Sequence, residues 1–380
     1  MSIEKLRDSI DEIDVKLVEL FRERMEISLE IAKEKRKQSL PTLNAAREKE
    51  ILLEVSQRLG EPLDGYGRIL YNTIFDLSKS YQNNYLREGS QLADKIKLAL
   101  EETPKLFPEK ATVACQGIRG SYSQIAADKL FTVPSIMYFN TFDSVFSAVE
   151  KGLCRYGILP LENSSYGSVG AVYDLMRKRQ FYIVRSIRLR VSHYLLGLPG
   201  SKLSDIKEIV SHEQALGQCE AFLKSMKDVK VTVFDNTAEA AKYVAQSGRK
   251  DLAAIASKSS GDNFNLDILQ KEVQDSDNNY TRFICISKKL EIYPGAHKIG
   301  LILSLPHEPS SLYHMIAKFS CQGLNLTKLE SRPIPGSDFE FMFYFELEAS
   351  VYSPALINLL SELEGRPDVF VFLGNYSEVL

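Results

Sequence analysis

The sequence predicts a multidomain chain of α and α/β class, and three observations support this fold class. The 380 residues are too many for one ordinary hydrophobic core. Apolar residues follow helical three-to-four spacing up to about residue 85, and short apolar runs alternate with helical ones beyond residue 108. The last 84 residues, 297–380, follow the order strand, helix, strand, strand, helix, strand. We therefore expect domains over residues 1–90, 108–290 and 297–380.

The composition excludes several functional classes. The net charge of −3 arises from nearly balanced signs and gives no general reason to bind nucleic acid or a membrane. The five cysteines are scattered without C-x-x-C spacing, and the histidines form no H-x-x-x-H pair, so we expect neither a metal site nor a cofactor. The acidic N-terminal stretch is unlike a targeting peptide, and we expect a cytoplasmic protein with reduced thiols.

The first 85 residues predict three helices. The first ends at Pro41, the second runs from Arg47 to the break at residues 60–62, and the third carries its apolar residues over 69–77 and includes Ser78 and Gln82. A polar connector follows, up to the boundary near residue 108. The pattern therefore favours a helical bundle ahead of the α/β segment.

An arginine interrupts the apolar seam of the first helix. The heptad passes through Ile10 and Leu17 to Arg24 and resumes at Ile31. A buried unpaired charge costs several kcal/mol, so Arg24 requires a partner. That partner is either an acidic side chain in an internal salt bridge, for which Glu48 is one candidate, or a bound anion.

Spacing along this helix is compatible with a bound anion. Arg24 and Lys35 are 11 residues apart, roughly 16 Å on nearly one face, so they could bracket a small dianion. Arg7 and Arg24 are 17 residues apart, roughly 25 Å, which is too far for one small ligand on a straight helix. If both arginines serve one site, Arg7 comes from a second chain, which predicts an intertwined homodimer or a higher homo-oligomer.

Motifs in this segment resemble the all-helical chorismate mutases: LRDSIDEID, ERMEISLEIAKEKRKQSLP, REKEIL and LSKSYQ. The resemblance implies that chorismate binds inside the bundle and rearranges to prephenate. This pericyclic step needs cations for two carboxylates and a donor at the ether oxygen, where Lys35 and Gln82 would act. Asn44 stands where the family usually has aspartate, which predicts altered affinity. The implied site residues are Arg7, Arg24, Lys35, Asn44, Arg47, Glu48, Ser78 and Gln82.

Polar turns recur in the α/β segment where strands run into helices: TVACQGIRGSYS, ILPLENSSYGSVGAVYDL, IVSHEQALGQC and VFDNTAEAA. Helix starts with free N–H groups bind anions, although the same residue types are also ordinary N-caps. Four such turns in one domain, with Gly117, Gly120 and Gly167 permitting close approach, favour a carboxylate-binding cleft between two α/β lobes.

The motifs GxxGSYS, LPLENSSYGSV, SHEQALGQC and NNYTRF occur in this order and are similar to the prephenate dehydratases. An isolated T-R-F would ordinarily be a strand edge with a solvated arginine. The resemblance instead implies a two-lobed fold like that of periplasmic binding proteins, with Thr281 and Arg282 facing the cleft. The candidate residues are Thr281, foremost, with Arg282, Phe283, Ser121, Tyr122, Glu162, Asn163, Ser164, Ser211, His212 and Thr237.

The reaction that this resemblance implies removes the ring hydroxyl and the ring carboxylate of prephenate to form phenylpyruvate. The site must donate a proton or a strong hydrogen bond to the leaving hydroxyl and move the leaving carboxylate out of water. We interpret Thr281 as a positioned donor, relaying a proton from Glu162 or a water, with His212 as a rival donor.

The C-terminal motifs HEPSSLYHM and LESRPIPG resemble ACT regulatory domains of ferredoxin-like fold, in which an amino acid binds between two copies. The expected phenylalanine-binding residues are Ser310, Ser311, Leu312, Glu330, Ser331, Arg332 and Pro333. Ser310 replaces the usual glycine, which predicts weaker feedback.

The combined order resembles the bifunctional chorismate mutase–prephenate dehydratases of phenylalanine biosynthesis over nearly the whole chain. The implied ligands are chorismate, prephenate and phenylalanine. One alternative is a two-lobed solute-binding or sensor protein, and another is a dehydratase whose first helices serve only for dimerisation. The second alternative does not explain Arg24 in an apolar seam.

Overall fold

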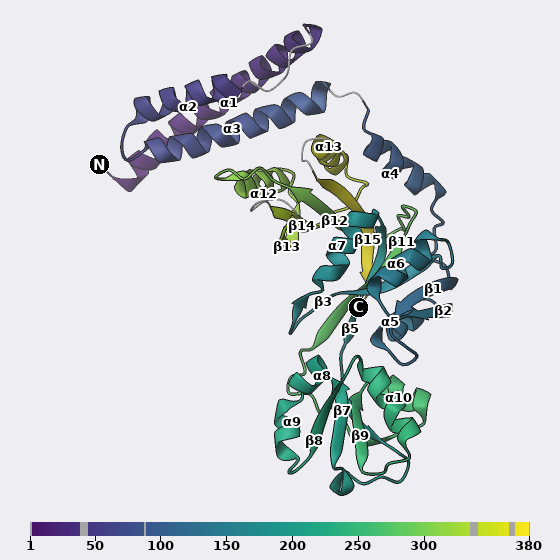
Figure 1. Ribbon diagram of the computed structural model, residues 1–380. Coiled ribbons are helices and arrows are strands. Elements are labelled where there is room, and N and C mark those ends of the chain that lie inside the picture. The colour runs from purple at the N-terminus through teal and green to yellow at the C-terminus, as the bar shows by residue number, and fades with distance from the viewer. Residues whose placement is uncertain (1, 39–44, 87–88, 335–340, 365–368, 380) are drawn as a thin grey trace. The chain divides into compact units, whose positions relative to one another are not determined.

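The computed structural model describes residues 2–38, 45–86, 89–334, 341–364 and 369–379 (Figure 1). By its internal contacts the chain forms two compact units. The first comprises Met1–Asp94, Leu303–Phe343 and Val351–Phe370, and the second comprises Lys95–Ile302, Tyr344–Ser350 and Val371–Leu380. In the described residues no helix is long and apolar enough to cross a membrane.

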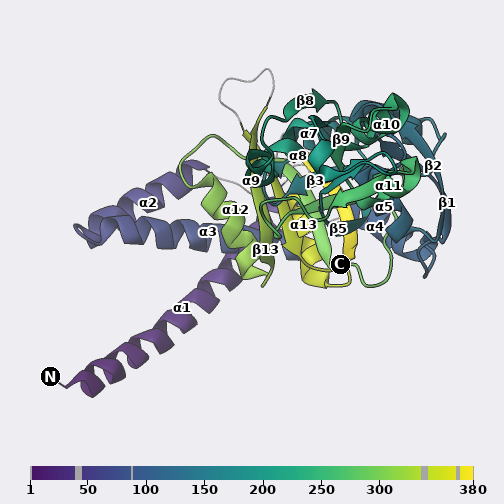
Figure 2. The same ribbon diagram turned by 90° about the horizontal axis from the view of Figure 1, so that it is seen from below.

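The predicted helical segment folds as three long helices in the first unit: α1 (Ile3–Lys37), α2 (Ala45–Leu59) and α3 (Asp64–Leu86). Helix α3 packs against both α1 and α2. Only the C-terminal half of α1 takes part in this packing, with Leu29 and Ala32 buried. Its N-terminal half runs clear of α2 and α3 (Figure 2), and Ile10 and Leu17 remain 56% and 52% exposed. Ile31 is also 51% exposed, so the apolar seam that the sequence predicts remains largely uncovered within one chain, and the buried Leu29 and Ala32 lie beside it.

The segment between the helical bundle and the boundary near residue 108 is not a polar connector, as the sequence suggested. It contains helix α4 (Gln91–Glu102), whose Leu92, Ile96 and Ala99 are buried. These apolar residues recur every three or four positions, so the helical period was present but masked by the charged residues between them.

The second unit contains two lobes, each built on its own sheet. The first sheet has the order β5-β11-β3-β1-β2, with the end of β15 parallel to β5. Its strands are β1 (Lys110–Gln116), β2 (Val133–Phe139), β3 (Tyr156–Asn163), β5 (Tyr182–Arg190), β11 (Tyr280–Ser287) and β15 (Phe370–Val379), with β4 (Gly167–Ser168) paired to β3. Helices α5 (Tyr122–Leu130), α6 (Phe142–Glu150) and α7 (Gly170–Arg179) belong to this lobe.

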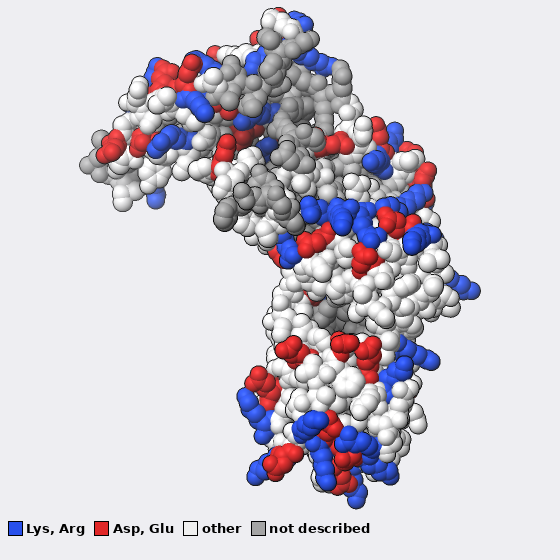
Figure 3. All heavy atoms as spheres, in the orientation of Figure 1, with Lys and Arg blue, Asp and Glu red and all other residues white. Residues whose placement is uncertain are grey.

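The second lobe has the strand order β10-β6-β9-β7-β8. Its elements are β6 (Tyr194–Gly197), η1 (Leu203–Asp205), β7 (Glu208–His212), α8 (Glu213–Gly217), α9 (Glu220–Ser225), β8 (Lys230–Phe234), α10 (Thr237–Ser247), β9 (Leu252–Ala256), α11 (Lys258–Phe264) and β10 (Asp267–Gln270). Residues 191–193 and 271–279 connect the two lobes. Basic and acidic side chains are interspersed over this lobe, at the bottom of Figure 3. The two-lobed α/β prediction is confirmed.

The C-terminal residues follow the predicted βαββαβ order. They form β12 (Lys298–Ser304), α12 (Ser311–Cys321), β13 (Asn325–Pro333), β14 (Phe341–Glu348), α13 (Pro354–Leu363) and β15, with the strand order β13-β14-β12-β15. Strands β14 and β15 each have residues in both compact units. Their ends in the second unit carry the carboxylates of Glu346 and Glu378.

Candidate active sites

A pocket of about 470 Å³ lies between the two lobes of the second unit. Each of the four polar turns that the sequence singled out contributes to its wall: Ser121 before α5, Gly167 before α7, His212 before α8 and Thr237 at the start of α10. A volume of this size is typical of a small-molecule site. The expectation of a cleft lined by polar helix starts is therefore confirmed.

The first of these turns also holds the two lobes together. Gly120 has a φ of 90°, and a Cβ there would lie 3.1 Å from the Ser260 Cα atom, so the turn requires glycine. The Gly120 carbonyl accepts hydrogen bonds from the hydroxyls of Ser257 and Ser260 in the second lobe, both at 3.1 Å. Ser121 caps α5 by accepting from the Gln124 N–H at 3.4 Å. The turn at Gly120 and Ser121 therefore both caps helix α5 and forms part of the cleft wall.

Thr281 lies on β11 at the pocket wall and is paired with Asn163 at the end of β3. The Asn163 amide nitrogen lies 2.8 Å from Thr281 Oγ1. The Asn163 carbonyl oxygen accepts from the backbone N–H groups of Ser165 and Tyr166, at 2.9 and 3.1 Å. Two backbone donors therefore fix the orientation of this amide, and the Thr281 oxygen accepts from it.

The structure brings seven of the eleven dehydratase candidates to the pocket. Those residues are Ser121, Tyr122, Asn163, His212, Thr237, Thr281 and Phe283. His212 also caps α8, because its Nδ1 accepts from the Gln214 N–H at 3.3 Å. The remaining four candidates, Glu162, Ser164, Ser211 and Arg282, do not line it.

Arg282 does not face the cleft, so that expectation is wrong. Side chains alternate along a strand, and Thr281 and Phe283 already take the cleft face of β11. Arg282 is 4% exposed and its Nε lies 2.7 Å from Glu162 Oε1. Glu162 is thereby engaged on the far face of the sheet, which removes it as a proton relay for Thr281.

Two serine candidates have structural positions instead. Ser211 is fully buried and donates to the Ile255 carbonyl at 2.6 Å. The Ser164 hydroxyl donates to the Asn278 carbonyl at 2.8 Å and accepts from the Tyr280 N–H at 2.9 Å. Ser164 therefore fastens the turn after β3 to the start of the Thr281 strand.

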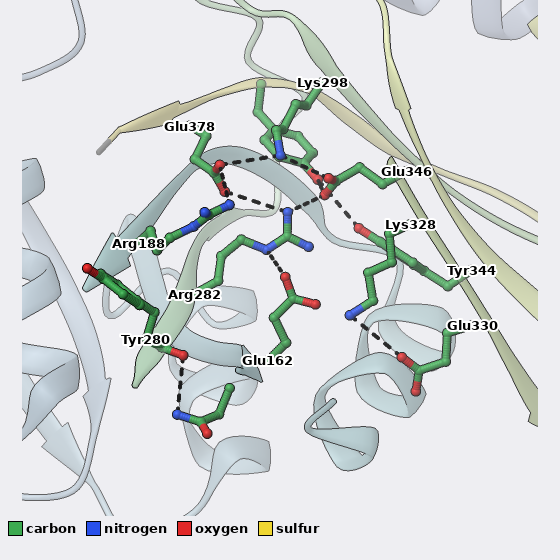
Figure 4. Close-up of polar contacts among 12 residues, drawn as sticks. Glu162, Arg188, Tyr280, Arg282, Lys298, Lys328, Glu330, Tyr344, Glu346 and Glu378 are labelled. Atoms are coloured by element: carbon green, nitrogen blue, oxygen red, sulfur yellow. Dashed lines mark hydrogen bonds and ion pairs between the residues drawn. The ribbon is translucent and has the colours of Figure 1, made fainter. Parts of the chain in front are cut away.

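A buried cluster of charges surrounds Arg282 (Figure 4). Its Nη1 lies 2.5 Å from Glu346 Oε2 and 3.7 Å from Glu378 Oε1. Lys298 approaches the same two carboxylates, at 3.0 and 3.4 Å. Burial raises the pKa of the Glu346 carboxyl, but Arg282 and Lys298 outweigh burial and lower that pKa to about 2. The carboxylates of β14 and β15 are thus bound to the strand that carries Thr281.

Several pocket residues escaped prediction from the sequence. The main ones are Gln116, His193 and Gln218, which line the pocket, and Asn279, whose Oδ1 accepts from the Asn163 amide at 2.9 Å. Gln218 falls within a quoted motif but had no stated role. His193 begins an apolar run that resembles an ordinary strand, so its only signal was a polar residue at a strand start.

The helical bundle places the predicted mutase residues along α1 and α3. Arg24 is half-buried, donates to Ser78 Oγ at 2.9 Å and lies over the Phe75 ring at 5.6 Å. Gln82 donates to the Ser28 hydroxyl. Arg24, Ser78 and Gln82 therefore lie along one α1–α3 contact, as a bundle site requires.

The other mutase candidates lie away from this α1–α3 contact or have other partners. Glu48 pairs with Lys79 at 3.4 Å, so it is not the partner of Arg24 that an internal salt bridge would need. Arg47 is exposed and pairs with Glu50 at 2.9 Å. Lys35 is half-buried and Arg7 is exposed on the uncovered half of α1. Asn44 lies outside the described residues.

The C-terminal candidates fall into two groups. Ser311 and Leu312 line a pocket of about 370 Å³ at the start of α12, whereas Glu330, Ser331, Arg332 and Pro333 end strand β13. Ser310 has a φ of 70°, in the left-handed region that favours glycine. This backbone conformation explains why glycine is the usual residue at this position in ACT domains.

Two family models match the chain. Residues 6–83 match chorismate mutase type II, and residues 113–291 match prephenate dehydratase. The chain is 34% identical over 317 residues to arogenate dehydratase/prephenate dehydratase 2 of Arabidopsis thaliana, covering 76% of this chain and 82% of the plant protein. It is 29% identical over 379 residues to the bifunctional chorismate mutase/prephenate dehydratase of Escherichia coli K12, covering 98% and 95%.

A solved structure supports the fold. A prephenate dehydratase from Arthrobacter aurescens, crystallised in complex with L-Phe, superimposes with a TM-score of 0.64 at 24% identity, covering 70% of this chain and 89% of that one. Three observations point to the same family: the order of the matched domains, the cleft between the lobes and the extent of the sequence similarity. The chain therefore belongs to the family of bifunctional chorismate mutase/prephenate dehydratases.

Proposed function

We propose that the chain catalyses two consecutive steps of phenylalanine biosynthesis, rearranging chorismate to prephenate in the helical bundle and converting prephenate to phenylpyruvate between the two lobes. The observation that carries the second step is Thr281, held at the pocket wall by an amide whose orientation the backbone fixes. In this proposal the mutase domain spans residues 1–90, the dehydratase domain spans 108–290 and the regulatory domain spans 297–380.

The hydrogen bond from Asn163 determines what the Thr281 hydroxyl can do. Because Oγ1 accepts from Asn163, the Thr281 proton is left to donate to another group. In the dehydratase step the bond to the ring carboxylate breaks and releases CO₂, its electron pair enters the ring, and the ring C–O bond breaks. The departing hydroxide gains one proton to leave as water. Thr281 stabilises the charge that develops on this oxygen.

The remainder of the pocket suits the other end of prephenate. The helix starts at Ser121 and Thr237 line the cleft from opposite lobes. Such ends attract carboxylates. We assign the pyruvyl carboxylate to these helix starts. The apolar Phe283 and Val191 in the same wall surround the ring carboxylate with poorly solvating groups. Poor solvation of this carboxylate favours its conversion to uncharged CO₂.

The mutase step needs no nucleophile, only charge and shape. Arg24 and Gln82 supply donors along the α1–α3 contact. We propose that a second copy of this chain covers the exposed half of α1 and contributes Arg7. Two features support a second copy: the uncovered apolar seam at Ile10 and Leu17, and the helical length between Arg7 and Arg24.

We also propose that phenylalanine binds to the C-terminal module near Ser311 and Leu312 and inhibits the dehydratase. The left-handed backbone at Ser310 is compatible with serine only at a cost of about 1–2 kcal/mol, which supports weak feedback. A chain cut near residue 290 would not test this cleanly, because it would lose Glu346 and Glu378 and leave Arg282 buried without them. Point substitutions at Ser311 and Leu312 are the better test.

The deciding experiment supplies chorismate to the purified full chain and follows chorismate, prephenate and phenylpyruvate together. Formation of phenylpyruvate through a prephenate intermediate is expected. Arogenate belongs in a parallel assay, because plant relatives carry arogenate dehydratase in their names. Loss of chorismate without phenylpyruvate would contradict the dehydratase assignment.

A cytoplasmic location, which rests on the isolated cysteines of the sequence, is tested by cell fractionation.

A further inference from the structure

Four polar side chains form a continuous hydrogen-bonded series that ends on Thr281. In order they are His193, Gln218, Asn279 and Asn163. Asn163 belongs to the first lobe and Gln218 to the second, while His193 and Asn279 lie in the two segments that connect the lobes. The series therefore runs through both connections and ends on the proposed donor.

The direction of each hydrogen bond follows from the backbone. A backbone N–H can only donate, so the Asn163 atom that accepts from Ser165 and Tyr166 is its oxygen. The Asn163 nitrogen then donates to Thr281 Oγ1 at 2.8 Å and to Asn279 Oδ1 at 2.9 Å. The identity of both Asn163 atoms is thus settled without reference to the rest of the series.

This direction propagates to the histidine. Since Asn279 Oδ1 accepts from Asn163, the Asn279 nitrogen faces Gln218 Oε1, at 2.8 Å. The same Gln218 oxygen lies 2.7 Å from His193 Nε2, which must therefore carry the proton. His193 is consequently required as the Nε2–H tautomer.

The surroundings of His193 favour this neutral form. The side chain is 2% exposed, and its Nδ1 has no hydrogen-bond partner among the described residues. Burial lowers the pKa of the imidazole, although the hydrogen bond to Gln218 acts in the opposite sense. A second ring proton would be placed on a buried nitrogen without an acceptor.

We propose that His193 is a positioning residue of the dehydratase: its Nε2–H holds Gln218 and Asn279, and through them Asn163, in the one orientation that leaves the Thr281 proton for the substrate. This inference rests on the proposed dehydratase function. His193 acts through Thr281, so it affects the step in which the C–O bond breaks more than substrate binding. Its loss should therefore lower kcat and change KM little.

A matched pair of variants tests the proton on Nε2. Gln and Met are similar in length, but only Gln can donate to the Gln218 oxygen. His193→Met should lower the dehydratase kcat by about 10- to 100-fold, with KM within about twofold. His193→Gln should stay within about fivefold of the parent kcat. The mutase rate of each preparation reports on folding and concentration, because that site lies elsewhere in the chain.

Nitrogen NMR of the His193 ring in the parent chain supplies a second test, whose readout does not depend on the activity of a variant. Assigned by its disappearance in His193→Gln, the ring should show a neutral Nε2–H tautomer near pH 7. The opposite tautomer or a doubly protonated ring overturns the proposal. Equal kcat values for the Gln and Met variants also overturn it, while leaving the dehydratase function standing. A parent chain that forms no phenylpyruvate would instead overturn the function itself.

Discussion

Arg282 and Glu346 form a buried ion pair, with Arg282 Nη1 2.5 Å from Glu346 Oε2 and both side chains almost inaccessible to solvent. Arg282 immediately follows Thr281 on β11, and Glu346 lies on β14. Any displacement of β14 must therefore either move the Thr281 strand or break a buried pair. This rigid link is a physical reason for coupling between the C-terminal strands and the dehydratase cleft.

Glu346→Gln should destabilise the protein strongly. Removing one partner of a buried pair leaves the other charge insufficiently compensated, at a cost of about 3–5 kcal/mol. The measurement is the thermal midpoint of unfolding. Glu220→Gln is the matched control, because Glu220 pairs with Lys224 at 2.8 Å on the exposed surface, where an ion pair contributes little to stability. Equal shifts for the two variants would show that the buried pair contributes no more than a surface one.

The same carboxylate predicts a pH dependence. The pKa of Glu346 is lowered from 4.5 to about 2 in the folded chain, so the unfolded chain binds the proton more tightly. The contribution of Glu346 to stability is complete above about pH 4.5 and is lost as the pH falls toward 2. The difference in unfolding midpoint between the parent and Glu346→Gln should therefore shrink over this range. A difference that stays constant down to about pH 2 would contradict the lowered pKa.

The sequence predicted the parts of the fold that depend on local patterns. Helical spacing predicted α1, α2 and α3, and the strand–turn–helix motifs predicted which residues reach the cleft wall. These succeed because caps, turns and apolar periods are set by neighbours in the chain. Helix α4 was missed, although half of its twelve residues are apolar, because five charged residues are interspersed among them.

Side-chain roles that depend on distant partners could not be predicted in the same way. Arg282 was expected in the cleft because it adjoins Thr281, but the carboxylates that hold it away lie on β3, β14 and β15. Simple alternation along β11 would have separated Thr281 from Arg282. His193 was missed because its partner Gln218 is 25 residues away and meets it only when the second lobe folds against the connecting segment.

Arg24→Ala should remove mutase activity, on the order of 10²-fold or more, because it deletes a charged donor at the α1–α3 contact. Dehydratase activity should remain within about a few fold, since distant sites usually act independently. Arg22→Ala is the matched control, as Arg22 is an exposed residue on the same helix. Parallel loss of both activities would indicate one shared site.

Mixing Arg7→Ala chains with Arg24→Ala chains should restore mutase activity. A mixed dimer has one site in which both arginines are intact and one in which both are missing. Random exchange of subunits in a symmetric dimer then yields roughly a quarter of the parent activity. Exchange is verified with differently tagged chains. If mixed dimers form and remain inactive, each site draws both arginines from one chain or does not use Arg7.

Thr281→Ala should abolish most phenylpyruvate formation while prephenate accumulates from chorismate. The variant removes the hydroxyl that accepts from Asn163 and donates to the leaving group, and loss of one such donor typically costs about 10²–10³-fold in kcat. Thr281→Ser keeps the hydroxyl but not the methyl group that restricts its rotamer, so it should retain an intermediate rate. Both rates are measured in the full chain, whose mutase activity serves as the internal control. If the Thr281→Ala enzyme turns over prephenate normally, Thr281 has only a structural role at the start of its strand. The donor to the leaving hydroxyl would then be His212, at the opposite wall of the same pocket.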